Sequence, residues 1–218
     1  MSKSKLKNWA KVGLLSVLWC GGLGQTPAQD AESQSAALDR LPKVWQERVH
    51  RLTREEFEAT LSFWAEKFAP TLTVTKLGES AEGLGIFQIE ITDTLVPDTD
   101  KQRALITALH GGPERSGTTA CLHLIEWLLG ESPEAVETRR KQRIRFIPVP
   151  NPYAYFVTDR FGNSLKIDPY TGGGVANWDL KTVTFKALDR SPEIRAVIEA
   201  IDDFQPEVHL DLHGTGLQ

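Results

Sequence analysis

Cysteine is scarce in this sequence, whose 218 residues contain only Cys20 and Cys121. Basic residues are not in excess either: 25 lysines and arginines stand against 29 aspartates and glutamates, giving a net charge of −4. A chain without a basic surplus lacks the electrostatic footprint of a nucleic-acid-binding protein, so nucleic acid is not expected as a partner. With 40% hydrophobic and 25% charged residues, the composition is that of a globular protein with one sizeable core.

The first 28 residues differ from the rest of the chain and have the features of a secretory signal peptide. Four lysines precede a short apolar run from Val12 to Cys20, and Thr26-Pro27-Ala28 offers small residues for cleavage. A charged region, a short apolar region and a small-residue cleavage site are the parts of such a signal. A buried N-terminal helix is the alternative structure for this run. Cys20 raises a lipoprotein alternative, which the bulky Trp19 directly before it disfavours.

Cleavage after Ala28 would remove Cys20 and leave Cys121 alone, so no internal disulfide could form. The apolar run from Val12 to Cys20 is shorter than the roughly 20 residues that cross a bilayer, and no stable membrane span is expected in the mature chain. We therefore expect an exported protein, periplasmic or secreted. Residues 29–50 are interpreted as a linker, and residues 51–218 as one domain.

Apolar periodicity predicts helices that alternate with strands over this domain. A capping box at Thr53 and Glu56 begins a helix that ends before Pro70. Alternating residues predict a β-hairpin from strands near 72–77 and 87–91, joined by a turn at 78–83. Further strands are expected at 104–109, 144–149 and 208–213, further helices near 116–129, 132 and 191, and irregular structure over 150–185. This order predicts an α/β fold with a mixed sheet sandwiched by helices, in which the last three strands are parallel.

Three potential metal ligands follow two of the predicted parallel strands. His110 comes directly after one apolar strand, Glu114 follows it across Gly-Gly-Pro, and His213 ends another strand. Ligands gather beyond the carboxyl ends of parallel strands, so these side chains are expected to converge. Two histidines and one glutamate form a ligand set used by catalytic zinc, which leaves a fourth position open. The sequence therefore predicts one zinc ion held by His110, Glu114 and His213.

The last strand leaves the exact ligand set open. His209, Asp211 and His213 alternate, so a strand would place all three side chains on one face. That arrangement permits a rival ligand set, or a role for Asp211 in orienting a ligand histidine, as carboxylates near metal sites commonly do. His50 and His123 fall in predicted helical stretches and are interpreted as structural.

Four segments together resemble the zinc carboxypeptidases of the M14 type and their deacylase relatives, from about residue 51 to the end. They are Leu77–Gly83, His110–Thr118, Pro150–Tyr153 and Asp211–Thr215. The resemblance implies that a metal-activated water attacks a peptide or amide carbonyl. It implies that Arg160, together with Arg115, stabilises the developing oxyanion.

The sequence departs from the family pattern in three places. Three residues separate His110 from Glu114 where the family has two, which implies a bulged loop. The segment from Asn177 to Lys181 occupies the stretch that contacts a substrate's terminal carboxylate in the family, with Lys181 where a bidentate arginine would be expected. A lysine is a point charge and not a planar fork, so its hold on a carboxylate is looser. The family's general-base glutamate comes from a strand well after the third ligand, whereas the sequence ends five residues beyond His213.

We accordingly expect the N-terminal part of a truncated catalytic domain, and three functions stay open. The first is a zinc metallocarboxypeptidase-like hydrolase that cleaves peptide or amide bonds outside the cytoplasm. The second is a deacylase of N-acyl amino acids, favoured by the altered segment at Lys181. The third is a non-catalytic metal-binding module that kept the fold and lost the base.

Overall fold

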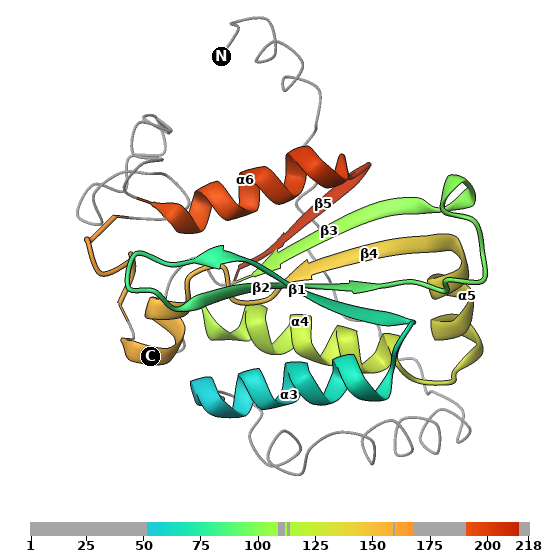
Figure 1. Cartoon of the computed structure of the whole chain (residues 1–218), viewed down its shortest axis with the longest axis horizontal. Helices are drawn as coiled ribbons and strands as arrows, with labels where there is room; N and C mark the ends of the chain where they lie inside the picture. Colours follow the sequence, from blue (N-terminus) through green and yellow to red (C-terminus); the bar gives the residue numbers. More distant parts are fainter. Residues whose placement is uncertain (1–51, 109–111, 113, 159, 168–190, 214–218) are drawn as a thin grey trace, which may run out of the picture.

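The computed structural model describes residues 52–108, 112, 114–158, 160–167 and 191–213. In these ranges five strands form one mixed sheet with helices on both faces, as Figure 1 shows. The α/β fold class predicted from the sequence is therefore confirmed. The predicted signal peptide and linker both lie outside the described residues.

The sheet has the strand order β1-β2-β4-β3-β5. The strands are β1 (Leu72–Glu79), β2 (Gly85–Ile91), β3 (Gln102–Ala108), β4 (Gln142–Ile147) and β5 (Val208–Leu212). Strand β2 is antiparallel to both β1 and β4, while β3 is parallel to both β4 and β5. The predicted hairpin and the predicted parallel arrangement of the last three strands are both present.

The turn of the hairpin lies later than the sequence predicts. Strand β1 continues through Glu79 because its register shifts between Lys76 and Gly78. The backbone N–H of Ser80 donates to the Leu84 carbonyl at 2.8 Å, and Gly83 adopts a φ of 80°, a conformation that favours glycine. A bulge adds one residue to one strand only, so alternation of apolar residues does not reveal it.

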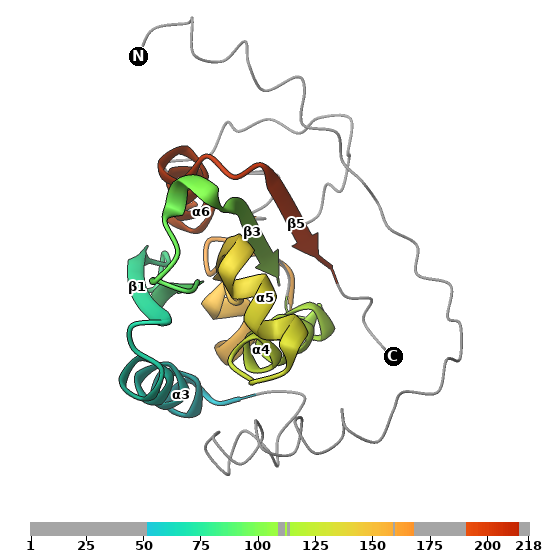
Figure 2. The ribbon, with the colours of Figure 1, turned by 90° about the vertical axis from the view of Figure 1, so that its right-hand side faces the viewer.

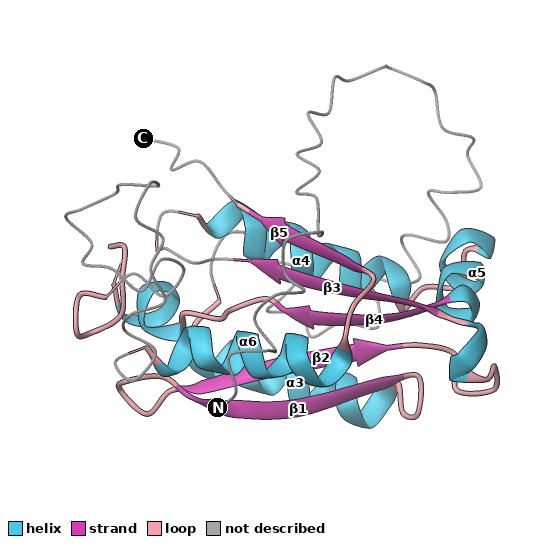
Figure 3. Ribbon diagram, turned by 90° about the horizontal axis from the view of Figure 1, so that it is seen from above, coloured by secondary structure: helices cyan, strands magenta, loops and turns pink. Residues whose placement is uncertain are grey.

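Helices cover the sheet unequally. Helices α3 (Arg54–Lys67) and α4 (Arg115–Leu128) pack on one face, and α6 (Pro192–Phe204) packs on the other, as Figure 2 shows. Figure 3 looks down on the sheet past α6. The short helix α5 (Pro133–Lys141) leads directly into β4.

Local sequence signals set the beginnings of the helices. The predicted capping box is present at α3: the Thr53 hydroxyl accepts the Glu56 N–H at 3.2 Å, and the Glu56 carboxylate accepts the Thr53 N–H at 2.8 Å. At α5 the Ser132 hydroxyl accepts the N–H of Ala135, and Pro133 occupies the first turn. The prediction of irregular structure over 150–185 is wrong at Tyr153–Val157, which form a short π-helix.

Each face of the sheet has its own apolar core. The larger core lies under α3 and α4 and includes Trp64, Ile89, Leu122, Ile125 and Phe146, all at most 1% exposed. The smaller core lies under α6 and includes Ile86, Leu105, Ile147, Val197 and Phe204. Strands β2, β3 and β4 contribute to both cores, which explains their apolar sequences. Burial on both faces holds β3 in place. The candidate site lies beyond the carboxyl end of this strand.

Candidate metal centre at the ends of β3 and β5

Glu114 and His213 reach the same edge of the sheet from segments far apart in the sequence. Strands β3 and β5 are parallel neighbours, with Thr107 opposite Asp211 and Ala108 opposite Leu212. His213 follows β5 directly, and Glu114 is the N-cap residue of α4, the helix that follows β3. Because both strands end at one edge, the residues that follow them meet there.

Close packing of α4 on β5 brings the two side chains together. Gly117 lies in the first turn of α4, three residues after Glu114, and it is buried. A Cβ atom added to Gly117 would overlap the Leu212 carbonyl oxygen and would lie 3.6 Å from the Cβ of Ala108. Only glycine allows the helix backbone this close to the end of β5.

The imidazole of His213 lies between two carboxylates. Its Nδ1 is 2.8 Å from Oε1 of Glu114, and its Nε2 is 2.7 Å from Oδ2 of Asp211. The Glu114 side chain is buried at 8% exposure, whereas that of His213 is 43% exposed. Asp211 therefore contacts the His213 ring, as in one of the two arrangements that the sequence leaves open.

The two carboxylates favour the protonated imidazole. The hydrogen bond with Asp211, followed by the one with Glu114, raises the pKa of His213 from 6.5 to about 10. A zinc ion needs the neutral imidazole, so metal and proton compete for His213. Metal binding near pH 7 should therefore release a proton from this residue.

This pKa shift leads to an expected result for the metal-free protein. The stabilisation from protonated His213 is fully present below about pH 6.5 and is lost as the pH rises through about 10. Its size stays within about 1 kcal/mol, because the side chain is partly exposed and solvent screens the pair. Urea unfolding from pH 6 to 10.5, in chelator, should show a greater loss of stability in the parent than in His213→Asn. Parallel curves would contradict this assignment.

The structure places the other predicted site residues as follows. Arg115 is the first residue of α4 and is partly buried, whereas Arg160 is exposed. The Arg160 carbonyl accepts the N–H of Gly112 at 3.2 Å, so its loop contacts the loop between β3 and α4. His110, Asn177 and Lys181 lie outside the described residues. Their predicted roles therefore stay predictions.

The geometry of Glu114 and His213 fits a shared metal ion. Bonds of about 2.0–2.2 Å to a tetrahedral zinc place two ligand atoms roughly 3.4 Å apart. The observed 2.8 Å between Nδ1 and Oε1 needs only a small adjustment to reach that separation. Among the described residues no group of three metal-binding side chains is found, and His110 is not among them. An imidazole nitrogen and a carboxylate oxygen are both ordinary zinc ligands.

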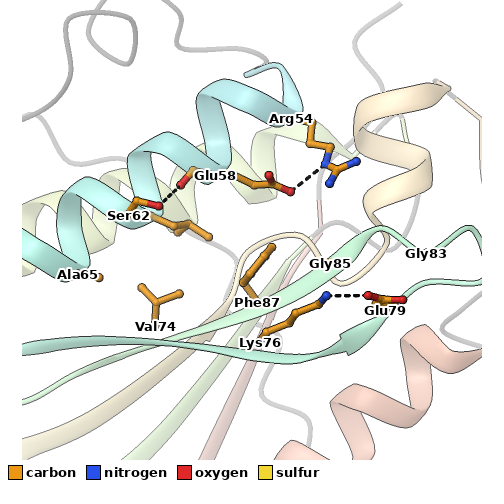
Figure 4. A pocket seen from close by; sticks show the side chains of 11 residues that line it. Arg54, Glu58, Ser62, Ala65, Val74, Lys76, Glu79, Gly83, Gly85 and Phe87 are labelled. Atoms are coloured by element: carbon orange, nitrogen blue, oxygen red, sulfur yellow. Dashed lines mark hydrogen bonds and ion pairs between the residues drawn. The ribbon is translucent and has the colours of Figure 1, made fainter.

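A separate hollow of about 470 Å³ lies between α3 and the β1–β2 hairpin, as Figure 4 shows. Its rim carries two ion pairs, Arg54 with Glu58 at 2.8 Å and Lys76 with Glu79 at 2.7 Å. Phe87 and other apolar side chains also line it. Strands β1 and β5 are the opposite ends of the strand order, so this hollow is distinct from the candidate metal centre.

Two residues beside the candidate metal centre, Thr107 and Gly117, are not predicted from the sequence. Thr107 lies within an apolar strand, is 1% exposed, and contacts both His209 and Asp211. A threonine in a buried run is a weak signal for a polar network, because its methyl group also packs well in strands. The need for glycine at position 117 depends on a chain segment about a hundred residues away, so no local pattern predicts it.

The fold and this edge of the sheet define an α/β protein with a histidine–carboxylate site beyond parallel strands. The sequence model of the family described as zinc carboxypeptidase matches residues 57–167, just over half of the chain. The chain therefore belongs to the zinc carboxypeptidase family, whose members are zinc-dependent. No curated protein sequence matches it.

Solved structures share the fold at low sequence identity. A carboxypeptidase A from Helicoverpa armigera has a TM-score of 0.64 and 22% identity over 86% of this chain and 52% of its own. A metallo-carboxypeptidase from Burkholderia cenocepacia has a TM-score of 0.59 and 20% identity over 76% and 42%. One from Pseudomonas aeruginosa has a TM-score of 0.56 and 19% identity over 76% and 40%. The chain thus spans about half the length of these proteins, or less.

None of the helices in the described part of the chain is both long and apolar enough to cross a bilayer.

Proposed function

We propose that this protein is a zinc-dependent hydrolase that cleaves peptide or amide bonds outside the cytoplasm. The observation that carries the proposal is the 2.8 Å contact between Glu114 Oε1 and His213 Nδ1 at the carboxyl ends of β3 and β5. Membership of the zinc carboxypeptidase family supports the reaction class. The features of a signal peptide in residues 1–28 support export.

In this proposal His110, Glu114 and His213 hold one zinc ion. When bound, such an ion polarises the scissile carbonyl and lowers the pKa of a water molecule. Asp211 holds the His213 ring, and Glu114 is held by its position at the start of α4. Arg160 and Arg115 are proposed to stabilise the oxyanion.

Peptides with a free C-terminus are the first candidate substrates, and N-acyl amino acids are the second. The second candidate is favoured by Lys181, which stands where the family pattern has an arginine. Asn177 and Lys181 are the proposed contacts to the substrate's carboxylate. A lysine offers a single charged donor, so it discriminates less sharply among carboxylates than a bidentate arginine.

The test is a metal-dependent assay of the full chain. The protein is purified, its zinc content is measured, and hydrolysis is followed on N-blocked dipeptides and on N-acetyl amino acids. We expect about one zinc per chain, loss of hydrolysis after treatment with a chelator, and recovery when zinc is restored. Hydrolysis that survives complete zinc removal would overturn the proposal. Zinc binding without hydrolysis of either substrate class would instead favour a non-catalytic module.

A further inference from the structure

A row of polar side chains connects β5 with β3 beside the candidate metal centre. The hydroxyl of Thr107, on β3, lies 3.0 Å from Nε2 of His209 and 2.9 Å from Oδ1 of Asp211, both on β5. The other oxygen of Asp211 lies 2.7 Å from Nε2 of His213, whose Nδ1 faces Glu114. Four consecutive contacts therefore lead from His209 to Glu114.

The chemistry of these groups sets the direction of the hydrogen bonds. A threonine hydroxyl has one proton, and an ionised carboxylate only accepts. Thr107 therefore donates to Asp211, as the geometry indicates. It then accepts a hydrogen bond from His209, which places a proton on Nε2 of that imidazole. An imidazole nitrogen that carries a proton does not bind a metal, so His209 does not offer Nε2 as a ligand in this arrangement.

Asp211 is consequently held through both of its oxygens. Thr107 fixes Oδ1 and His213 occupies Oδ2. A carboxylate held at both oxygens has little freedom to rotate, and it holds the imidazole ring in turn. Thr107 is 1% exposed and lies in a strand that is buried on both faces, so its side chain has little freedom to move.

We propose that Thr107 and Asp211 are positioning residues that fix the His213 ring with Nδ1 directed at Glu114, and that His209 contacts Thr107 but does not belong to the ligand set. The inference rests on the proposed function, because it assigns His213 as a zinc ligand. The sequence leaves two interpretations of the last strand open, a rival ligand set and an orienting role for Asp211. The proposal favours the second.

Loss of a carboxylate that orients a metal-binding histidine typically lowers metal affinity 10- to 100-fold. We expect a decrease in this range for Asp211→Asn. Thr107→Val removes the hydroxyl while keeping the shape of the side chain, and it should lower zinc affinity about tenfold. Thr107→Ser keeps the hydroxyl and should retain affinity close to that of the parent. His209→Ala leaves all proposed ligands in place, so its affinity should change less than about threefold.

The experiment measures the zinc dissociation constant of the full chain by competition with a chromophoric chelator, and the absorption spectrum of the cobalt-substituted protein. A matched control is Thr75→Val, which makes the same change at an exposed residue of β1. Thr107→Val and Asp211→Asn should both change the cobalt spectrum, whereas Thr107→Ser and Thr75→Val should not. Rescue by serine separates the hydroxyl's role from general packing.

Failure of this inference differs from failure of the proposed function. If the parent binds no zinc, or if His213→Ala binds it as well as the parent, the proposed function fails, and this inference fails with it. If His213→Ala loses zinc while Asp211→Asn and Thr107→Val bind like the parent, only the positioning role is overturned. If His209→Ala loses zinc as completely as His213→Ala, then His209 is a ligand and the inference is wrong. Should Thr107→Val not fold, Asp211→Asn and Thr107→Ser still decide the outcome.

Discussion

Replacing Gly117 with alanine is expected to destabilise the protein and to weaken zinc binding at the same time. The new Cβ would overlap the Leu212 carbonyl oxygen and lie 3.0 Å from the carbonyl carbon. Both are backbone atoms, so no side-chain rotation relieves the overlap. Overpacking of this kind typically costs 1–3 kcal/mol, while the gain in helix propensity returns up to about 1 kcal/mol. Because the overlap involves backbone atoms, we expect the upper end of this cost, about 3 kcal/mol, and hence a net loss in the free energy of unfolding of about 2 kcal/mol.

The backbone shift needed to relieve this overlap would also affect the candidate metal centre. Leu212 directly precedes His213, and Gly117 lies one turn after Glu114, so moving the helix and strand apart lengthens the 2.8 Å contact. Urea unfolding and zinc titration of Gly117→Ala measure the two effects. The control is Gly78→Ala, where a Cβ would find no atom within 4 Å. Gly78→Ala should change the free energy of unfolding by no more than about 0.5 kcal/mol. A Gly117→Ala protein as stable as the parent would contradict the close packing of α4 on β5.

Replacing His213 with alanine is expected to have the largest effect on metal binding. His213 is the described residue that contacts both Glu114 and Asp211, and its removal deletes the nitrogen that faces Glu114. A catalytic zinc site has only three protein ligands, so losing one should weaken zinc binding at least a hundredfold, about 3 kcal/mol. Glu114→Gln should lower the affinity as well, because an amide oxygen lacks the carboxylate's charge.

Isothermal titration of the full chain with zinc measures this loss. The matched control is His123→Ala, since His123 lies in α4 and contacts Glu126 at 3.3 Å. Zinc affinity of the control should equal that of the parent. Equal zinc binding by His213→Ala and the parent would refute the assignment of His213 as a ligand.

Much of the fold was predictable because the signals are local. The capping box of Thr53 and Glu56 and the Ser132-Pro133 start of α5 each depend on residues within one turn. The buried run that became β3 indicates a strand covered on both faces. The sequence also predicted that Glu114 and His213 lie at one edge of the sheet. Both residues follow parallel strands, and parallel neighbours end on the same side of a sheet.

Other features depend on contacts between distant segments and were not predictable. Local patterns do not reveal that β4 lies between β2 and β3, since strand order depends on which segments pair. The bulge after Lys76 and the π-helix of Tyr153–Val157 break the regular periods on which such predictions rest. The π-helix is anchored over long range, because the hydroxyl of its Tyr155 accepts the N–H of Leu52 at 3.2 Å.

The amino-acid sequence by itself determined most of the regular secondary structure, the α/β class and the types of side chain available at the candidate site. Apolar periodicity and capping are properties of neighbouring residues, so they can be read along the chain. Only the tertiary structure decided that Asp211 contacts His213, that Thr107 joins Asp211 to His209, and that Gly117 meets Leu212. The contacts of Thr107 and Gly117 join segments of β3, α4 and β5 about a hundred residues apart. Their geometry arises from packing, which a linear pattern does not encode.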